Sequence, residues 1–90
     1  MFNLADYNEL LTDKITIVYF YNSNCKVFEN KIKKFNINNI IYIDIDDNII
    51  LSNELFITSV PLFKIYKNKI CIEDILGSYN NLENILKSHL

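Results

Sequence analysis

The feature that most constrains the fold is a pair of apolar, β-branched segments separated by one amphipathic helix. Residues 15–21 and 40–45 contain very few polar side chains, which is typical of strands that are covered on both faces. Between them, Phe28, Ile32 and Phe35 recur four and three residues apart, as on one face of a helix. Two strands joined through a helix lie parallel, with a right-handed crossover. The sequence therefore predicts an α/β protein.

The remaining segments add a helix before the first strand and a helix, a hairpin and a last helix after the second. We expect helices at 6–12, 25–35 and 49–56, strands at 62–66 and 70–75 around a turn at 67–69, and a last helix with Leu82, Ile85, Leu86 and Leu90 on one face. Asp6 is expected to cap the first helix, and Asn80 the last, with Glu83 three residues on. Residues 1–90 are expected to form one domain, a mixed four-stranded sheet with helices on both faces and a vestigial fifth strand at Phe2 to Leu4.

Charge and hydropathy exclude several classes of partner. The nine basic residues are all lysines and the net charge is −2, whereas nucleic-acid binding needs a basic face. The longest apolar segment, 15–21, is far shorter than the ~20 residues of a membrane helix. The N-terminus has no leader pattern, and two cysteines make no secreted disulfide scaffold. We therefore expect a reduced, cytoplasmic monomer that binds neither nucleic acid nor membrane.

Two short stretches and one glycine carry a resemblance to a known family. Phe-Tyr-Asn-Ser-Asn-Cys at 20–25 resembles the Phe-Tyr-Ala-Pro-Trp-Cys of thioredoxin and protein disulfide isomerase domains. Ser-Val-Pro-Leu-Phe at 59–63 resembles the family's Gly-Ile-Pro-Thr-Leu, whose proline is cis. Gly77, the only glycine, lies where the family keeps a glycine before the last helix. The chain thus resembles the thioredoxin-like superfamily over nearly its whole length, which implies the thioredoxin fold.

Three departures from the family's pattern bear on activity. The second cysteine of the Cys-x-x-Cys motif is Phe28, the tryptophan before the nucleophile is Asn24, and the buried acid of the central strand is Tyr19. The resemblance therefore implies an atypical monothiol member, in which Cys25 is the catalytic residue and no resolving cysteine follows it.

Cys25 is expected in the first turn of a helix, where free N–H groups and the helix dipole favour an anion. Lys26 adds a positive neighbour. A thiolate there attacks a disulfide and forms a mixed disulfide, which Phe28 cannot resolve. Release then falls to an external thiol such as glutathione, as a co-substrate and with no other cofactor. The alternative interpretation is that Cys25 is a small buried hydrophobe with no redox role.

Pro61 also has two interpretations. It either begins a strand, where its missing N–H costs little, or follows a cis bond that exposes the Val60 backbone to an extended peptide. We predict a substrate-binding site at Asn24, Lys26, Val60 and Pro61. Two functions fit this site: thiol–disulfide exchange with protein or peptide thiols, which makes the chain a monothiol disulfide oxidoreductase, or redox-inactive binding of a peptide or partner protein beside a cis-proline.

Cys71 is a poor substitute for the missing second thiol. The strand that begins after Pro61 extends for ~15 Å before the turn that precedes Cys71, whereas a disulfide needs Cα atoms within about 7 Å. We predict no Cys25–Cys71 bond and a core position for Cys71.

The remaining polar candidates are weak. His89 stands alone near the C-terminus and is expected to be solvated. Asp44, Asp46 and Asp47 are expected to cap a strand exit, because no further ligands stand at metal-binding spacing. We therefore predict no metal site.

Overall fold

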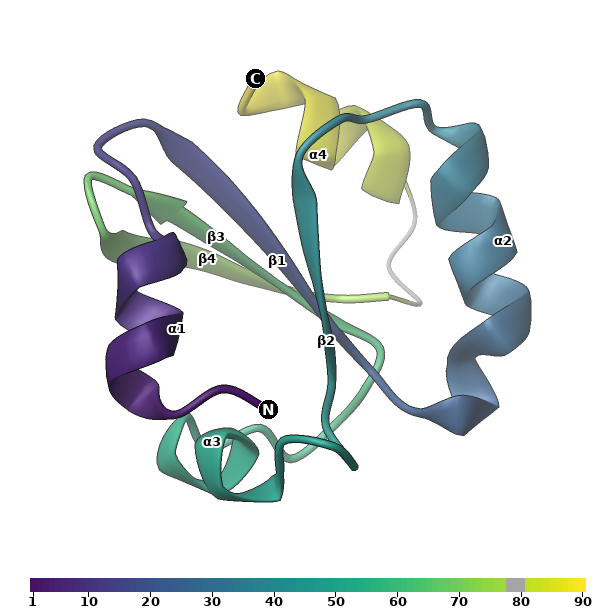
Figure 1. Cartoon of the computed structure of the whole chain (residues 1–90). Coiled ribbons are helices and arrows are strands. Elements are labelled where there is room, and N and C mark those ends of the chain that lie inside the picture. The colour runs from purple at the N-terminus through teal and green to yellow at the C-terminus, as the bar shows by residue number, and fades with distance from the viewer. Residues whose placement is uncertain (78–80) are drawn as a thin grey trace.

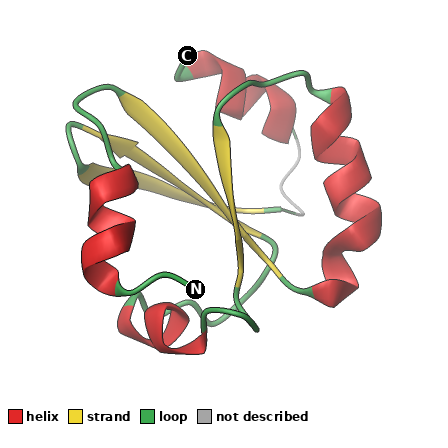
Figure 2. Cartoon of the chain, in the orientation of Figure 1, coloured by secondary structure: helices red, strands yellow, loops and turns green. Residues whose placement is uncertain are grey.

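The computed structural model describes residues 1–77 and 81–90, which form one four-stranded sheet flanked by helices (Figures 1 and 2). In chain order the elements are α1 (Leu4–Leu10), β1 (Ile15–Tyr21), the 3₁₀ turn η1 (Ser23–Cys25), α2 (Lys26–Lys34), β2 (Ile40–Asp44), α3 (Ile49–Glu54), β3 (Leu62–Lys67), β4 (Ile70–Leu76) and α4 (Leu82–Ser88). The order and type of the main predicted elements agree with this arrangement.

The strands are arranged in the order β2-β1-β3-β4. β1 and β2 are parallel, with Val18 opposite Ile41. β3 is antiparallel to both β1 and β4, and Tyr19 on β1 lies opposite Phe63 on β3. The prediction of a mixed α/β sheet is confirmed.

Each face of the sheet carries its own hydrophobic core, so β1 is buried on both sides as its composition requires. The core under α2 and α4 comprises Ile17, Tyr19, Ile32, Phe35, Phe63, Ile65, Ile75, Leu82 and Leu86. The core under α1 and α3 comprises Tyr7, Leu11, Val18, Phe20, Ile43, Leu51 and Tyr66. Figure 1 shows the two helix pairs on opposite sides of the strands.

Asparagine takes the left-handed backbone positions that glycine often fills in other proteins. Asn36, Asn39, Asn68 and Asn81 all have positive φ, and asparagine tolerates this region better than most residues. Asn68 and Lys69, at 52° and 66°, form the tight turn between β3 and β4. The predicted cap Asn80 lies outside the described residues.

The predicted N-terminal strand at residues 2–4 is wrong. The side chain of Asn3 accepts a hydrogen bond of 2.8 Å from the backbone N–H of Asp6, so Asn3 caps α1 and the helix begins at Leu4. Asp6 therefore lies in the first turn rather than at the cap. The backbone N–H of Phe2 donates to the side chain of Asn48, not to a neighbouring strand.

Two further expectations, for Cys71 and His89, are wrong. Cys71 is exposed rather than part of the core, because it lies on the edge strand β4, beside the irregularity in the register with β3 at Ile65 and Tyr66. His89 is half-buried rather than solvated, since its Nε2 lies 2.8 Å from a carboxylate oxygen of Glu73. Both Cys25 and Cys71 are free cysteines.

Candidate functional site

The passage from β1 to α2 positions Cys25. After Tyr21, Asn22 is extended, and its side-chain oxygen accepts a hydrogen bond of 3.0 Å from the backbone N–H of Asn24. Its carbonyl oxygen accepts another of 3.0 Å from the N–H of Cys25. These bonds close the turn η1, so Cys25 occupies the N-cap position of α2 and not its first turn. The predicted helix began one residue too early, at Cys25, because residues 23–25 fold as a 3₁₀ turn.

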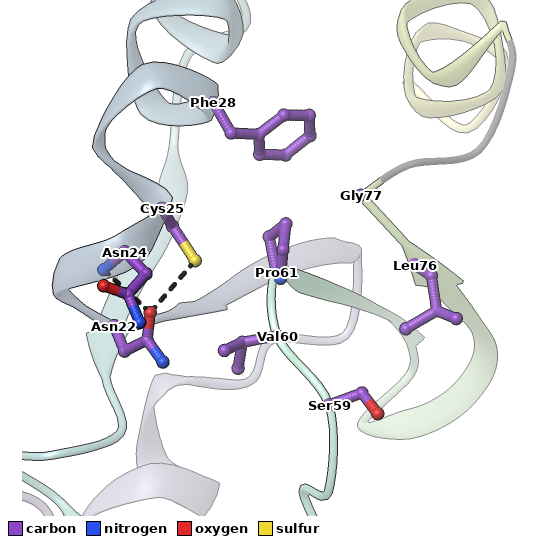
Figure 3. A pocket seen from close by; sticks show the side chains of 9 residues that line it. All are labelled: Asn22, Asn24, Cys25, Phe28, Ser59, Val60, Pro61, Leu76 and Gly77. Carbon is purple, nitrogen blue, oxygen red and sulfur yellow. Dashed lines mark hydrogen bonds between the residues drawn. The ribbon is translucent and has the colours of Figure 1, made fainter.

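The thiol of Cys25 is covered, yet it borders an open pocket. Cys25 is 6% exposed, and its sulfur donates to the side-chain oxygen of Asn22 at 3.4 Å. In Figure 3 the sulfur points towards Pro61, across the space between α2 and the start of β3. The peptide bond between Val60 and Pro61 is cis.

The pocket, of about 540 Å³, brings most of the sequence-predicted site residues together. Its lining comprises Asn22, Asn24, Cys25, Phe28, Ser59, Val60, Pro61, Leu76 and Gly77. Lys26 is the exception, since it is exposed and does not belong to this lining. As the first residue of α2, Lys26 is exposed to solvent and not turned into the pocket.

Close packing around Gly77 forms the wall opposite Cys25. The backbone N–H of Gly77 donates to the carbonyl oxygen of Pro61 at 2.8 Å. A Cβ at residue 77 would lie 2.5 Å from Cγ of Pro61 and 2.7 Å from Cε1 of Phe28, far closer than non-bonded carbons approach. Glycine is therefore required here for lack of space. Sequence reasoning identified Gly77 as a landmark but missed its contact, and it did not place Phe28 in the pocket.

Tyr19 lies at the position where the family keeps an acid, and it is fully buried. Its ring stacks on Phe63 with centroids 4.8 Å apart and lies 6.1 Å from the ring of Phe28. The hydroxyl has no hydrogen-bond partner among the described residues. Burial, and then the charges of Cys25 and Glu29, raise the pKa of Tyr19 above its ordinary value. The group beneath the pocket is therefore a neutral phenol.

Comparison with known proteins shows which fold this chain shares. No protein-family model matches the chain. A thioredoxin of Coprinus comatus is 29% identical over 99 residues, which covers 98% of this chain and 93% of that protein. The structure of a Fasciola hepatica thioredoxin has a TM-score of 0.78 at 18% identity and covers 96% of this chain and 93% of its own. The structure of a mutant thioredoxin from Halobacterium salinarum has a TM-score of 0.77 at 17% identity, covering 97% of this chain and 85% of its own.

The chain is thus an α/β protein with the thioredoxin fold. Its sequence is similar to that of a thioredoxin, and its fold is similar to those of thioredoxins of known structure.

Two further observations bear on membranes and metals. Within residues 1–77 and 81–90, no helix is long and apolar enough to cross a membrane. Among the same residues, no three or more His, Cys, Asp or Glu side chains are grouped so that they could hold a metal ion.

Proposed function

We propose that this thioredoxin-like protein takes part in thiol–disulfide exchange through Cys25, as a monothiol member of its superfamily. The observation that carries the proposal is the position of the Cys25 sulfur. It lies at the N-cap of α2, borders the pocket and points towards Pro61. The proposed substrates are protein or peptide disulfides, with glutathione as the external thiol.

The proposed cycle has two exchanges. The thiolate of Cys25 attacks one sulfur of a substrate disulfide, a new S–S bond forms, and the old bond breaks as the second sulfur leaves with its electron pair and takes up the proton. Cys25 is thereby oxidised and the leaving thiol is reduced. An external thiol then attacks the substrate's sulfur in the mixed disulfide, a disulfide forms between these two sulfurs, and Cys25 leaves and takes up the proton of the external thiol. Phe28 supplies no sulfur, so the second exchange is intermolecular.

The backbone at the N-terminus of α2 supports the first step. The first N–H groups of a helix have no partner within the helix, and they stabilise a developing thiolate. The wall formed by Phe28, Pro61 and Gly77 on the other side of the pocket is apolar. The edge of the pocket at Val60 is suited to an extended peptide, which pairs its backbone with an exposed strand end.

A second candidate function uses the same pocket without chemistry. Cys25 is 6% exposed and its thiol already has an acceptor in Asn22, while Phe28 and Tyr19 replace two groups of the family's redox site. These observations favour a module that binds a peptide or partner protein beside Val60 and Pro61.

Incubation with oxidised glutathione separates the two functions. Thiol–disulfide exchange predicts one glutathione adduct on Cys25, identified by intact mass and peptide mapping and removed by reduced glutathione. Cys71 provides the internal control, and Cys25→Ser should abolish the adduct. Failure of Cys25 to form an adduct, under conditions that modify Cys71, would exclude the exchange function and leave the binding module.

Insulin reduction tests the role of the missing second thiol. The native protein should fail to reduce insulin with a thioredoxin reductase, because a lone thiol cannot complete the dithiol cycle. Sustained turnover in that assay would show that the monothiol mechanism is wrong.

A further inference from the structure

We propose that Asn22 is a positioning residue whose side-chain amide holds Cys25 in its protonated, resting form and so slows its reaction. The inference rests on the proposed function and concerns its regulation. It assigns a role to a side chain at a position where the resembling family motif has alanine.

The contacts of Asn22 fix the direction of its amide. The side-chain oxygen accepts the backbone N–H of Asn24 at 3.0 Å and the thiol of Cys25 at 3.4 Å (Figure 3). The N–H of Asn24 needs an acceptor, so it is the oxygen of the amide, and not its nitrogen, that lies at this point. The thiol of Cys25 is therefore the second donor to an oxygen that the turn already holds in place.

This geometry distinguishes the two protonation states of the sulfur. A thiol donates to the oxygen of Asn22, but a thiolate has no hydrogen to donate and brings negative charge against the negative end of the amide dipole. Rotating the amide would offer its NH₂ group to the sulfur, but the N–H of Asn24 would then face a donor. Both responses are unfavourable, so the contact favours the protonated sulfur.

The surroundings give the thiolate little compensation from side chains. None of the residues that line the pocket is charged. Tyr19, from β1, is a buried neutral phenol, and Glu29, from α2, is acidic, so neither offers a positive charge to the thiolate. Lys26 is exposed outside the pocket. Because Cys25 is 6% exposed, bulk water does not readily replace the amide as a partner.

The test is the rate of carbamidomethylation of Cys25 by iodoacetamide in a Cys71→Ser background. At pH 7, Asn22→Ala should react about threefold to tenfold faster than the parent, which corresponds to the loss of one ordinary hydrogen bond. Asn22→Asp should react more slowly than the parent, because a carboxylate faces the sulfur. At pH 11, the Asn22→Ala and parent rates should agree within about twofold.

Asn30→Ala is the matched control, since Asn30 is an exposed asparagine of α2 that does not line the pocket. It should leave the pH 7 rate within about twofold of the parent. Asn22→Ser keeps a hydroxyl that caps the turn and also donates to a thiolate. It should react like Asn22→Ala, and it replaces that variant if thermal unfolding shows that the alanine protein does not fold.

Two results would overturn the inference. One is a pH 7 rate for Asn22→Ala and Asn22→Ser no higher than that of the parent. The other is an equal acceleration at both pH values, which indicates better access and no effect on the proton. Absence of a glutathione adduct on Cys25 would instead refute the proposed exchange function, and a pH-dependent acceleration in Asn22→Ala would still establish the amide's hold on the proton.

Discussion

Exposure alone suggests that Cys71 is better suited to react than Cys25, but the surroundings of the two thiols suggest the opposite. Cys25 is nearly covered, but its thiol faces a neutral amide and a pocket without charged lining. Cys71 is exposed, but its thiol donates to a carboxylate oxygen of Asp74 at 3.4 Å. Partial burial of the sulfur, together with Asp74, raises the pKa of the Cys71 thiol. Local charge, as well as access, therefore decides which sulfur is suited to react.

The difference follows from where each thiol lies on the sheet. Cys25 lies beyond the end of β1, where the chain turns into α2 and the pocket opens between α2 and β3. Cys71 lies at the far end, directly after the β3–β4 turn, on an edge strand. The pocket end of the sheet holds the one cysteine that borders Pro61, and the turn end holds a cysteine beside a surface ion pair between Lys64 and Asp74.

Substitution of Phe28 by cysteine should have the largest effect on the difference between Cys25 and Cys71. Positions 25 and 28 lie three residues apart at the start of α2, where neighbouring turns face one another. Mild oxidation of Phe28→Cys should give a monomer with an internal disulfide and one free thiol, that of Cys71. Loss of the ring should lower the free energy of unfolding by up to about 3 kcal/mol. Intact mass and thiol counting after oxidation measure the first result, and chemical denaturation measures the second.

Phe28→Ser is the control, since it removes the same ring without adding a thiol. A product in which Cys71 takes part, or a disulfide-linked dimer as the main species, would show that the two ends of the sheet are not separated as described.

Gly77→Ala should disturb the pocket end alone. The added methyl group would meet Pro61 and Phe28 at less than 3.0 Å, and such overpacking costs about 1–3 kcal/mol. We expect a lower melting temperature and an altered alkylation rate at Cys25, with no change in the rate at Cys71. An unchanged melting temperature, or an equal change at both cysteines, would contradict the close contact between these three residues.

Tyr19→Phe should stabilise the protein, because it removes a buried hydroxyl that has no partner among the described residues. The expected gain is about 1 kcal/mol, the usual cost of leaving such a group unsatisfied. Tyr7→Phe is the contrasting variant on the other face of the sheet. Its hydroxyl is paired with that of Tyr66 at 2.7 Å, so its loss should destabilise. Denaturation midpoints of the two variants that shift in the same direction would contradict this assignment.

Much of the fold was accessible from local pattern. The apolar segments at 15–21 and 40–45 and the amphipathic residues of α2 fixed the parallel pair and its crossover, because burial on both faces leaves few alternatives. The element ends were less certain. Asn3 and Asn22 are caps that depend on side-chain hydrogen bonds, and asparagine serves equally well in a cap, a turn or a loop.

Most of the site residues predicted from the sequence line the candidate pocket, but their contacts were not predicted. Cys25, Asn24, Val60 and Pro61 meet in one pocket, whereas Lys26 does not join them. The direction of a lysine at a helix start depends on neighbouring elements, which periodicity does not reveal. The exposure of Cys71 was missed for a related reason, since its strand pattern is apolar and only the strand order shows that β4 is an edge.

Asp74→Asn should have the smallest effect and should make the reactivities of the two thiols more similar. The carboxylate charge disfavours the Cys71 thiolate and so raises the pKa of that thiol; its removal should lower the pKa and increase the thiolate fraction near pH 8. Because Asp74 is more than half exposed, solvent screens the charge and the alkylation rate at Cys71 should rise only about twofold to fivefold. Asparagine keeps an acceptor for the thiol, so packing is preserved, and the rate at Cys25, at the opposite end of the sheet, should not change. Competitive alkylation with isotope-labelled iodoacetamide measures both cysteines in one sample, and an unchanged rate at Cys71 would show that burial of the sulfur, and not the charge of Asp74, governs this thiol.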